Sequence, residues 1–505
     1  MLQSFGEKYS WLLPIISLIL LAATPANAQE QLSEPKLLLG GVLPNSVAVL
    51  PFENLSPDPD NAHFAAGIHE STLNQLTKIR GLTVIARTSV MPYQKQPPTV
   101  PEIAKRLNVE AVMEGSVRYA NDRVLIRVQL VDGQTGTHLW SDEFNRELTD
   151  VSAIQAEIAR HIAMAMQVQL LPDEQARIAN RPTQSSVALK HYLYALSLPD
   201  PVLYPEYLPA YIDSLEQAVA VDPKFSEAYA DLAWGYYTRR ERDIALEYAE
   251  KAIALKPTSG SAFSLLAVSL EQYKVHEEET RTAYERAVQL SPNDPEVLIE
   301  YGSFLVEQIG NDPEAIRIGK LTVAIDPSNA SFHGRLGYIF LNAGDLQGAA
   351  AHLREAIRLD PGVYTNYFEL ATVGFLSGNN CSARENLNRA AQVMASGATF
   401  RVGYIAYLYG LLGEPHQAAK LLAQYEESLG DPERENWRPI GWAILGTRDK
   451  ERALLEWTMT VDGYLQENQP VSRGRMSRFR DNWLDDPMLE QAEFLQLRRR
   501  LGFRE

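Results

Sequence analysis

The phrase Ala356-Ile-Arg-Leu-Asp-Pro361 recurs with small changes along the middle of the chain. Its five versions end at prolines that stand 34, 35, 35 and 34 residues apart: Pro223, Pro257, Pro292, Pro327 and Pro361. A fixed period of this size is typical of a solenoid, in which repeated supersecondary units stack on one another. The period therefore decides the fold of the larger part of the chain.

The units resemble tetratricopeptide repeats, each of which is a pair of helices. The clearest copy runs from Phe332 to Pro361 and has small residues, Gly337 and Ala349, where the two helices of such a unit cross closely. Large apolar residues fill the positions between them. The first and last units are more divergent, as expected for units that must cap an exposed apolar face.

In the tetratricopeptide register, the first helix of each unit lines a concave groove. Aromatic side chains exposed in a groove are typical anchors for a bound peptide. The alternative is that several of these side chains pack between neighbouring units. Six aromatic residues take groove-facing positions and form the candidate peptide site: Trp234, Tyr237, Tyr338, Phe368, Phe375 and Tyr407.

A small α+β domain is predicted ahead of the repeats. Val47 to Phe52 and Leu82 to Arg87 are short apolar runs consistent with buried strands, and amphipathic helix patterns follow them. Three further β segments lie between Ala111 and Phe144, with Asn121-Asp122 as a hairpin turn. The order βαβαβββα favours helices on one face of a sheet. The expected fold class is this α+β domain followed by an all-α tetratricopeptide-repeat superhelix.

Several motifs of this domain occur in a recognisable order: Val47-Ala-Val-Leu-Pro-Phe-Glu-Asn-Leu55, Phe64-Ala-Ala-Gly67, Val84-Ile-Ala-Arg87, Glu114-Gly-Ser-Val-Arg118 and Gly136-Thr-His-Leu-Trp140. Together they resemble the TolB amino-terminal-like (FlgO-like) domain. The resemblance implies a bacterial envelope or signalling protein, in which such a domain often precedes tetratricopeptide repeats. Relatives often carry a winged-helix or nucleotide-cyclase domain before a membrane segment, and we expect neither activity here. TolB's β-propeller has no counterpart in this chain either.

The amino terminus has the pattern of an export signal. An apolar run from Trp11 to Ala23 is short for a membrane span and suits a signal-peptide core. Ala26 and Ala28 form a small-residue cleavage site, so we expect cleavage after Ala28 and a periplasmic product. The alternative is an uncleaved anchor at residues 11–23 that holds the protein at the inner membrane.

Composition narrows the class of partner. The net charge of -17 argues against nucleic-acid binding. Arginines cluster near the end, but acidic residues are interleaved with them. This pattern favours a solvated terminus, with an anion-binding patch as the alternative. Cys381 is the only cysteine, which excludes an intramolecular disulfide and a zinc site made of thiolates.

The chain shows no familiar catalytic motif. It has no His-Glu-x-x-His pair, nucleophile elbow or Walker-type loop. His63 and His69 have the wrong spacing for a helical zinc pair and are expected to be surface or packing residues. Asp58, Asp60 and Asn61 lack the spacing of a calcium loop. We therefore expect no enzyme, no catalytic residue, no metal and no cofactor.

These observations lead to one main hypothesis and one rival. The main hypothesis is an exported, non-enzymatic scaffold that binds other envelope proteins or peptides through the groove and the TolB-like domain. The rival is a membrane-anchored sensory or regulatory module of a signalling system. The expected divisions are a signal peptide at 1–28, a lead-in at 29–45, the α+β domain at 46–170, a linker at 171–185, about eight helix pairs at 186–466 and a capping segment at 467–505.

Overall fold

The computed structural model describes residues 43–500, with the exception of 59–60, 96, 200, 202–203, 274–276, 311, 395–401, 430–437 and 467–485. It divides into two compact units, residues 1–301 with 324–327 and residues 302–323 with 328–505. The expected signal segment, its cleavage site at Ala26 and Ala28, and four arginines of the terminal cluster lie outside the described residues.

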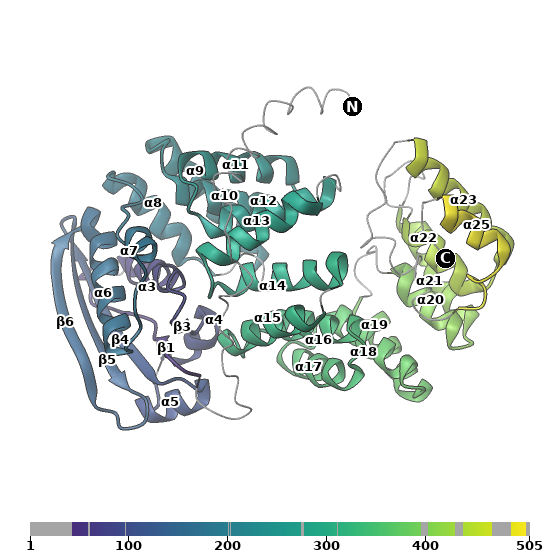
Figure 1. The fold of residues 1–505 in the computed structure, drawn as a ribbon, viewed down its shortest axis with the longest axis horizontal. Coiled ribbons are helices and arrows are strands. Elements are labelled where there is room, and N and C mark those ends of the chain that lie inside the picture. Colours follow the sequence, from purple (N-terminus) through teal and green to yellow (C-terminus); the bar gives the residue numbers. More distant parts are fainter. Residues whose placement is uncertain are drawn as a thin grey trace. The chain divides into compact units, whose positions relative to one another are not determined.

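The first unit contains a mixed sheet in the order β3-β1-β4-β5-β6 (Figure 1). β1 runs parallel to β3 and β4, and β4, β5 and β6 form an antiparallel meander. β2 pairs with the second half of β4. The strands are β1 (Ser46–Val49), β2 (Glu53–Asn54), β3 (Thr83–Val84), β4 (Ala111–Ala120), β5 (Arg123–Asp132) and β6 (His138–Glu147).

The hairpin between β4 and β5 forms where the sequence predicts it. Asn121 and Asp122 both have positive φ, 52° and 58°, which is the geometry of a type I′ turn. Its twist matches the twist of the flanking strands, and all ten residues of β4 pair with β5. The predicted order βαβαβββα is confirmed, with β2 and the short helix α4 (Arg87–Val90) as additions.

The prediction that all helices lie on one face of the sheet is wrong for one helix. α3 (Ala62–Leu76) and α6 (Val151–Ala165) share a face, and Phe64 of α3 stacks on Tyr119 of β4 at 4.0 Å. α5 (Val100–Leu107) packs with Ala48 and Val112, which point to the opposite face. The reason is handedness: the crossover from β1 to β3 through α3 and the crossover from β3 to β4 through α5 run in opposite directions across the sheet. Right-handed connections therefore place the two helices on opposite faces.

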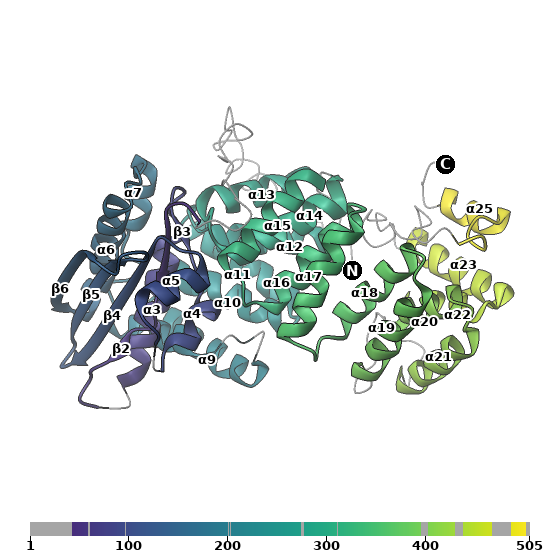
Figure 2. The ribbon, with the colours of Figure 1, turned by 90° about the horizontal axis from the view of Figure 1, so that it is seen from below.

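Eight helix pairs follow within the described residues, three in the first unit, four in the second and one divided between them. Figure 2 shows the later pairs in succession. They are α8 (Ser186–Ser197), α9 (Leu208–Val221), α10 (Ser226–Thr238), α11 (Arg242–Leu255), α12 (Gly260–Tyr273), α13 (Glu277–Leu290), α14 (Pro295–Phe304), α15 (Asp312–Ile325), α16 (Ala330–Asn342), α17 (Leu346–Leu359), α18 (Tyr364–Leu376), α19 (Asn380–Val393), α20 (Val402–Leu411), α21 (Pro415–Leu429), α22 (Arg438–Thr447) and α23 (Lys450–Gln466).

The five periodic prolines mark the ends of second helices. α9, α11, α13, α15 and α17 each end two residues before one of them. Proline lacks a backbone N–H and disfavours a helical conformation of the residue before it, so the helix stops there. Close crossings explain the small residues: a Cβ at Gly337 would lie 2.6 Å from Cγ of Leu353 on the partner helix.

The range expected to be a linker contains a packed helix, α7 (Pro172–Ile178). Pro172 and Glu174 stand in its first turn, where both residue types favour a helix start. The buried Glu174 carboxylate accepts hydrogen bonds from the N–H groups of Arg80 and Leu171, at 3.0 and 2.9 Å. This carboxylate ties α7 back onto the α+β domain.

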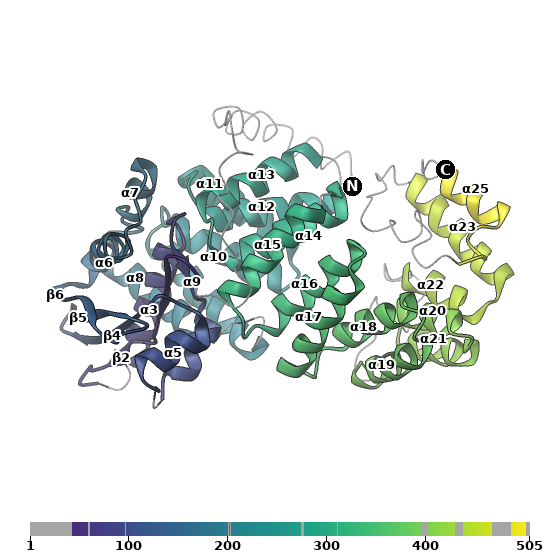
Figure 3. The ribbon, with the colours of Figure 1, turned by 60° about the horizontal axis from the view of Figure 1, so that its bottom comes forward.

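At the other end of the chain, the described part of the capping segment packs onto the last helices of the second unit. It holds α25 (Ala492–Arg500), which lies beside α23 (Figure 3). Leu489, Phe494 and Leu497 are buried in the same apolar cluster as Tyr407 and Trp457.

The α+β domain and the repeats approach each other closely where α3 crosses α8. A Cβ built at Gly67 of α3 would collide with the carbonyl oxygen of Leu193 on α8, and its carbonyl carbon would be only 2.9 Å away. Only glycine fits at this position. Gly67 belongs to the Phe64-Ala-Ala-Gly67 motif, so the structure gives this motif a role in seating the first helix of the array.

We predict that Gly67→Ala destabilises the first unit by about 1–3 kcal/mol, because the methyl group must push α8 away from α3. Hydrogen exchange in α3 and α8 should accelerate. Gly362→Ala is the control, since its nearest neighbour is a side-chain atom of Asp360 at 3.1 Å. Unchanged exchange in α3 and α8 of the Gly67 variant would contradict the proposed tight crossing.

A second prediction concerns His69, which is buried, lies 2.9 Å through Nε2 from the Val49 carbonyl oxygen and meets Phe52 edge-on. Burial lowers the pKa of the imidazole from 6.5 to about 4. Between these values the unfolded chain binds a proton that the folded chain does not, so stability falls as the pH drops from about 6.5 to 4. His69→Gln should reduce this fall in denaturant titrations at pH 7 and pH 5. The exposed His138→Gln should retain it.

Candidate functional site

Two of the predicted groove aromatics lie together in the first unit. Trp234 and Tyr237, both on α10, are partly exposed, and their ring centroids lie 5.9 Å apart in a stacked arrangement. Tyr248 of α11 joins them against a small core of Ala233, Ala249 and Leu265. These rings therefore pack against the small core on one side and leave aromatic surface accessible on the other.

The four predicted residues in the second unit divide into two kinds. Tyr338 on α16 and Phe375 on α18 are partly exposed and retain accessible ring surface. Phe368 is fully buried and Tyr407 is 2% exposed, so neither can offer its ring to a peptide in this conformation. These two side chains are packed in the interior, as expected under the alternative that groove-register aromatics pack between neighbouring units.

Tyr407 is held by the capping segment. Its hydroxyl donates to Oδ2 of Asp486 at 2.9 Å, and Arg448 donates to the same carboxylate oxygen at 2.7 Å. Burial and the Asp486 carboxylate raise the pKa of the Tyr407 hydroxyl far above its usual range. The sequence could not assign this role, because α20 is apolar along almost its whole length and the register alone does not distinguish its faces.

The junction within the first unit is rich in polar contacts that sequence reasoning missed. The Arg87 guanidinium donates to the carbonyl oxygens of Leu196, Ser197 and Leu198 at 2.8, 3.2 and 3.3 Å. These carbonyls end α8, so the cation also meets the negative end of the helix dipole. Glu70 lies 3.7 Å from the same guanidinium. Arg87 closes the Val84-Ile-Ala-Arg87 motif, which gives that motif a docking role as well.

A second set of contacts joins the α+β domain to a loop more than two hundred residues later. Asp326 follows α15, and its two carboxylate oxygens accept hydrogen bonds from the hydroxyls of Thr88 and Ser89, the latter at 2.6 Å. Ala86 N–H donates to the Ile325 carbonyl at 3.0 Å, and the Asn293 amide donates to the Ile79 carbonyl at 2.8 Å. Side chains and backbone thus hold the domain against the loops between repeats.

Charged groups of α10 are also engaged by this junction. Lys78 of the α+β domain is close enough to Glu227, Asp231 and Lys256 to interact electrostatically with each of them. Burial lowers the pKa of the Lys78 ammonium to about 8 and raises the pKa of the Asp231 carboxyl to about 7. Part of the α10 surface is therefore covered by the chain's own α+β domain.

Among the described residues, no group of three or more His, Cys, Asp or Glu side chains is arranged to hold a metal ion. His333 and His352 do meet, with Nδ1 atoms 3.1 Å apart, and burial lowers the pKa of His352 to about 4. Cys381 is exposed at the start of α19. Over the described ranges, no helix has both the length and the apolar character to cross a membrane.

Comparison with known families matches two parts of the chain. Residues 44–161 match the model of the HilA/YgeH-like transcriptional regulator, second domain. Residues 230–295 and 320–364 match tetratricopeptide repeats, which confirms this part of the prediction. The chain thus carries a tetratricopeptide-repeat module for protein–protein interaction. The finer resemblance to TolB remains a prediction.

Among curated proteins, the chain is similar to "Putative adenylate cyclase 3" of Rhizobium meliloti (strain 1021), with 33% identity over 237 residues, 45% of this chain and 40% of that protein. It is also similar to "Protein CTR9 homolog" of Arabidopsis thaliana, with 22% identity over 47% of this chain and 23% of that protein. The chain spans less than half of either relative. Among solved structures, the type IV pilus biogenesis factor PilW matches 43% of this chain and 97% of its own, at 19% identity and a TM-score of 0.36.

We predict that Asp326→Ala loosens the junction, because the hydroxyls of Thr88 and Ser89 lose their carboxylate partner. Loss of a buried hydrogen-bond partner costs about 1–3 kcal/mol. Hydrogen exchange over residues 85–90 should rise, although the change is far away in sequence. Asp345→Ala is the control, because Asp345 caps α17 locally by accepting from Gly348 N–H. Protection of residues 85–90 equal to that of the unaltered chain would contradict the assigned role of Asp326.

Proposed function

We propose that this chain is a non-enzymatic, protein-binding module of a bacterial signalling or regulatory system. The observation that carries the proposal is the buried junction between two modules. Tetratricopeptide repeats, which bind proteins, are joined through Arg87 and Asp326 to an α+β domain that matches the second domain of transcriptional regulators. A partner bound to either module of the first unit would therefore act on the other through fixed contacts.

The two matches that favour a regulatory context are to proteins with different activities. One is a transcriptional regulator and the other is named as an adenylate cyclase. Segments that this chain shares with proteins of different activities fit an input or coupling role better than a catalytic one. The TolB-like motifs fit the same role, since the resemblance implies envelope or signalling proteins.

The proposed binding surfaces are the partly exposed groove aromatics of each unit taken by itself: Trp234 and Tyr237 in the first unit, and Tyr338 and Phe375 in the second. Rigid aromatic rings lose little conformational entropy on binding and often dominate the affinity of an interface. Protein or peptide partners of the envelope are therefore the proposed ligands, and no cofactor takes part.

We further propose that the chain works at the inner membrane, held there by the apolar residues 11–23. This location places a regulatory module where envelope signals arrive. The second candidate is the exported scaffold, cleaved after Ala28 and released to the periplasm, and the small-residue pattern of Ala26 and Ala28 favours it.

A complementation experiment tests the regulatory proposal. Deletion of the gene should change a defined set of transcripts, and the intact chain should restore them. Trp234→Ala should fail to restore them while keeping the thermal unfolding temperature of the intact chain within a few degrees. Met164→Ala is the control, since Met164 is 68% exposed on α6, away from the groove positions. A deletion that leaves transcripts unchanged would rule out the regulatory role, and full rescue by Trp234→Ala would rule out the groove surface.

A further inference from the structure

Within the described residues, one face of the sheet is partly exposed over the second half of β4 and the first half of β5, which pair with each other. α5 packs against this face only near the start of β4, at Val112. Beyond that point the outward residues include Ser116 and Arg118 of β4 and Leu125 and Arg127 of β5. The segment that follows β2 runs along the edge of this area, because β2 pairs with β4 at Ser116 and Val117.

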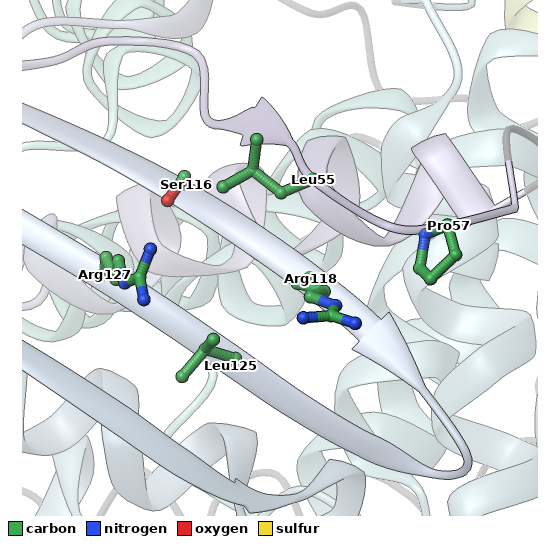
Figure 4. A pocket seen from close by; sticks show the side chains of 6 residues that line it. All are labelled: Leu55, Pro57, Ser116, Arg118, Leu125 and Arg127. Atoms are coloured by element: carbon green, nitrogen blue, oxygen red, sulfur yellow. The ribbon is translucent and has the colours of Figure 1, made fainter.

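A shallow pocket of 370 Å³ lies on this partly exposed face, and Figure 4 shows the side chains around it. Three strands or segments contribute two residues each. The residues that line this site, the sheet pocket, are Leu55 and Pro57 after β2, Ser116 and Arg118 of β4, and Leu125 and Arg127 of β5.

The sheet pocket combines apolar surface with positive charge. Leu55 is 41% exposed, Pro57 is exposed and Leu125 is partly exposed, so apolar side chains meet water there. The two cations differ in their partners. Arg127 contacts Glu143 of β6 through Nε at 2.6 Å, and both side chains of that pair are more than half exposed. Such exposed ion pairs contribute little stability, so Arg127 can exchange its partner at small cost.

Arg118 has no such partner: within the described parts of the chain, no side-chain hydrogen bond or ion pair engages its guanidinium. The residue also ends the Glu114-Gly-Ser-Val-Arg118 motif. An exposed arginine with five N–H donors in a planar fork suits a carboxylate, which it can bind through two parallel hydrogen bonds. The pocket wall therefore offers a ready site for an anionic group.

The charge of the pocket differs from that of the whole chain. Acidic residues outnumber basic ones by 64 to 47 in the sequence, yet the six lining residues include two arginines and no acid. We propose that the sheet pocket binds an acidic peptide segment that carries apolar residues next to its carboxylates. The carboxylates would pair with Arg118 and Arg127, and an apolar side chain would cover Leu55 and Leu125.

The shape of the pocket favours a peptide over a small anion. A lone phosphate or carboxylate would meet the arginines but leave the leucines and Pro57 in contact with water. An extended segment can do both, because alternate side chains along it point the same way at intervals of about 6.6 Å. This inference depends on the proposed function only for the idea that the α+β domain meets a protein.

Binding of a defined peptide to the purified full-length chain tests the proposal. The peptide is a fluorescein-labelled nonamer, Gly-Ser-Glu-Leu-Glu-Leu-Glu-Ser-Gly, titrated by fluorescence anisotropy at low salt. We expect saturable binding that Arg118→Glu weakens by about tenfold or more, the size expected when a charge-assisted pair is replaced by repulsion. Leu55→Ser should weaken it several-fold while both arginines remain.

Arg123→Glu is the control. Arg123 is an exposed arginine of the same strand as Arg127, bound to Asn145 and absent from the pocket lining. Its change should alter the affinity by less than about twofold. Equal effects of the changes at 118 and 123 would show nonspecific charge attraction and overturn the proposal. So would equal affinity for a nonamer with serine in place of leucine, or no binding by a chain that still restores transcripts in the complementation experiment.

Discussion

The fixed docking of α8 onto the α+β domain is the constraint on which the first unit depends. Gly67 lets α3 approach the α8 backbone, and Arg87 binds the carbonyl groups at the end of α8. One contact needs the absence of a side chain and the other needs a long charged one. Together they fix how closely α8 approaches the α+β domain and where α8 ends. The later helices of this unit are positioned relative to α8.

Two of the sequence motifs thus describe a junction rather than a ligand site. The Phe64-Ala-Ala-Gly67 motif supplies the close crossing, and Val84-Ile-Ala-Arg87 supplies the cap of α8. The same junction engages charged residues of α10, where Lys78 meets Glu227 and Asp231. The α10 surface, which the repeat register assigns to ligand binding, is therefore partly covered by the α+β domain. The area of α10 that a partner can contact is correspondingly smaller.

The sequence predicted well the features that depend on local periodicity. The proline spacing placed the ends of five second helices, and Asn121-Asp122 placed a hairpin turn. It predicted less well where one face of a helix had to be chosen. α18 and α20 are apolar on nearly all sides, so the register could not separate the buried Phe368 and Tyr407 from exposed rings. The position of α5 could have been derived from the handedness of parallel crossovers.

Asp326 shows a different limit, because nothing near it in sequence distinguishes it from other aspartates that end a repeat. Its partner Ser89 lies 237 residues away. This separation also has a consequence for biosynthesis. At a translation rate of roughly 5–20 residues per second, the ribosome needs about 10–50 s to make the intervening chain. During that time the α+β domain can fold, but the hydroxyls of Thr88 and Ser89 remain hydrated because the Asp326 carboxylate has not yet been made. The first unit is therefore completed only after Asp326 has been synthesised.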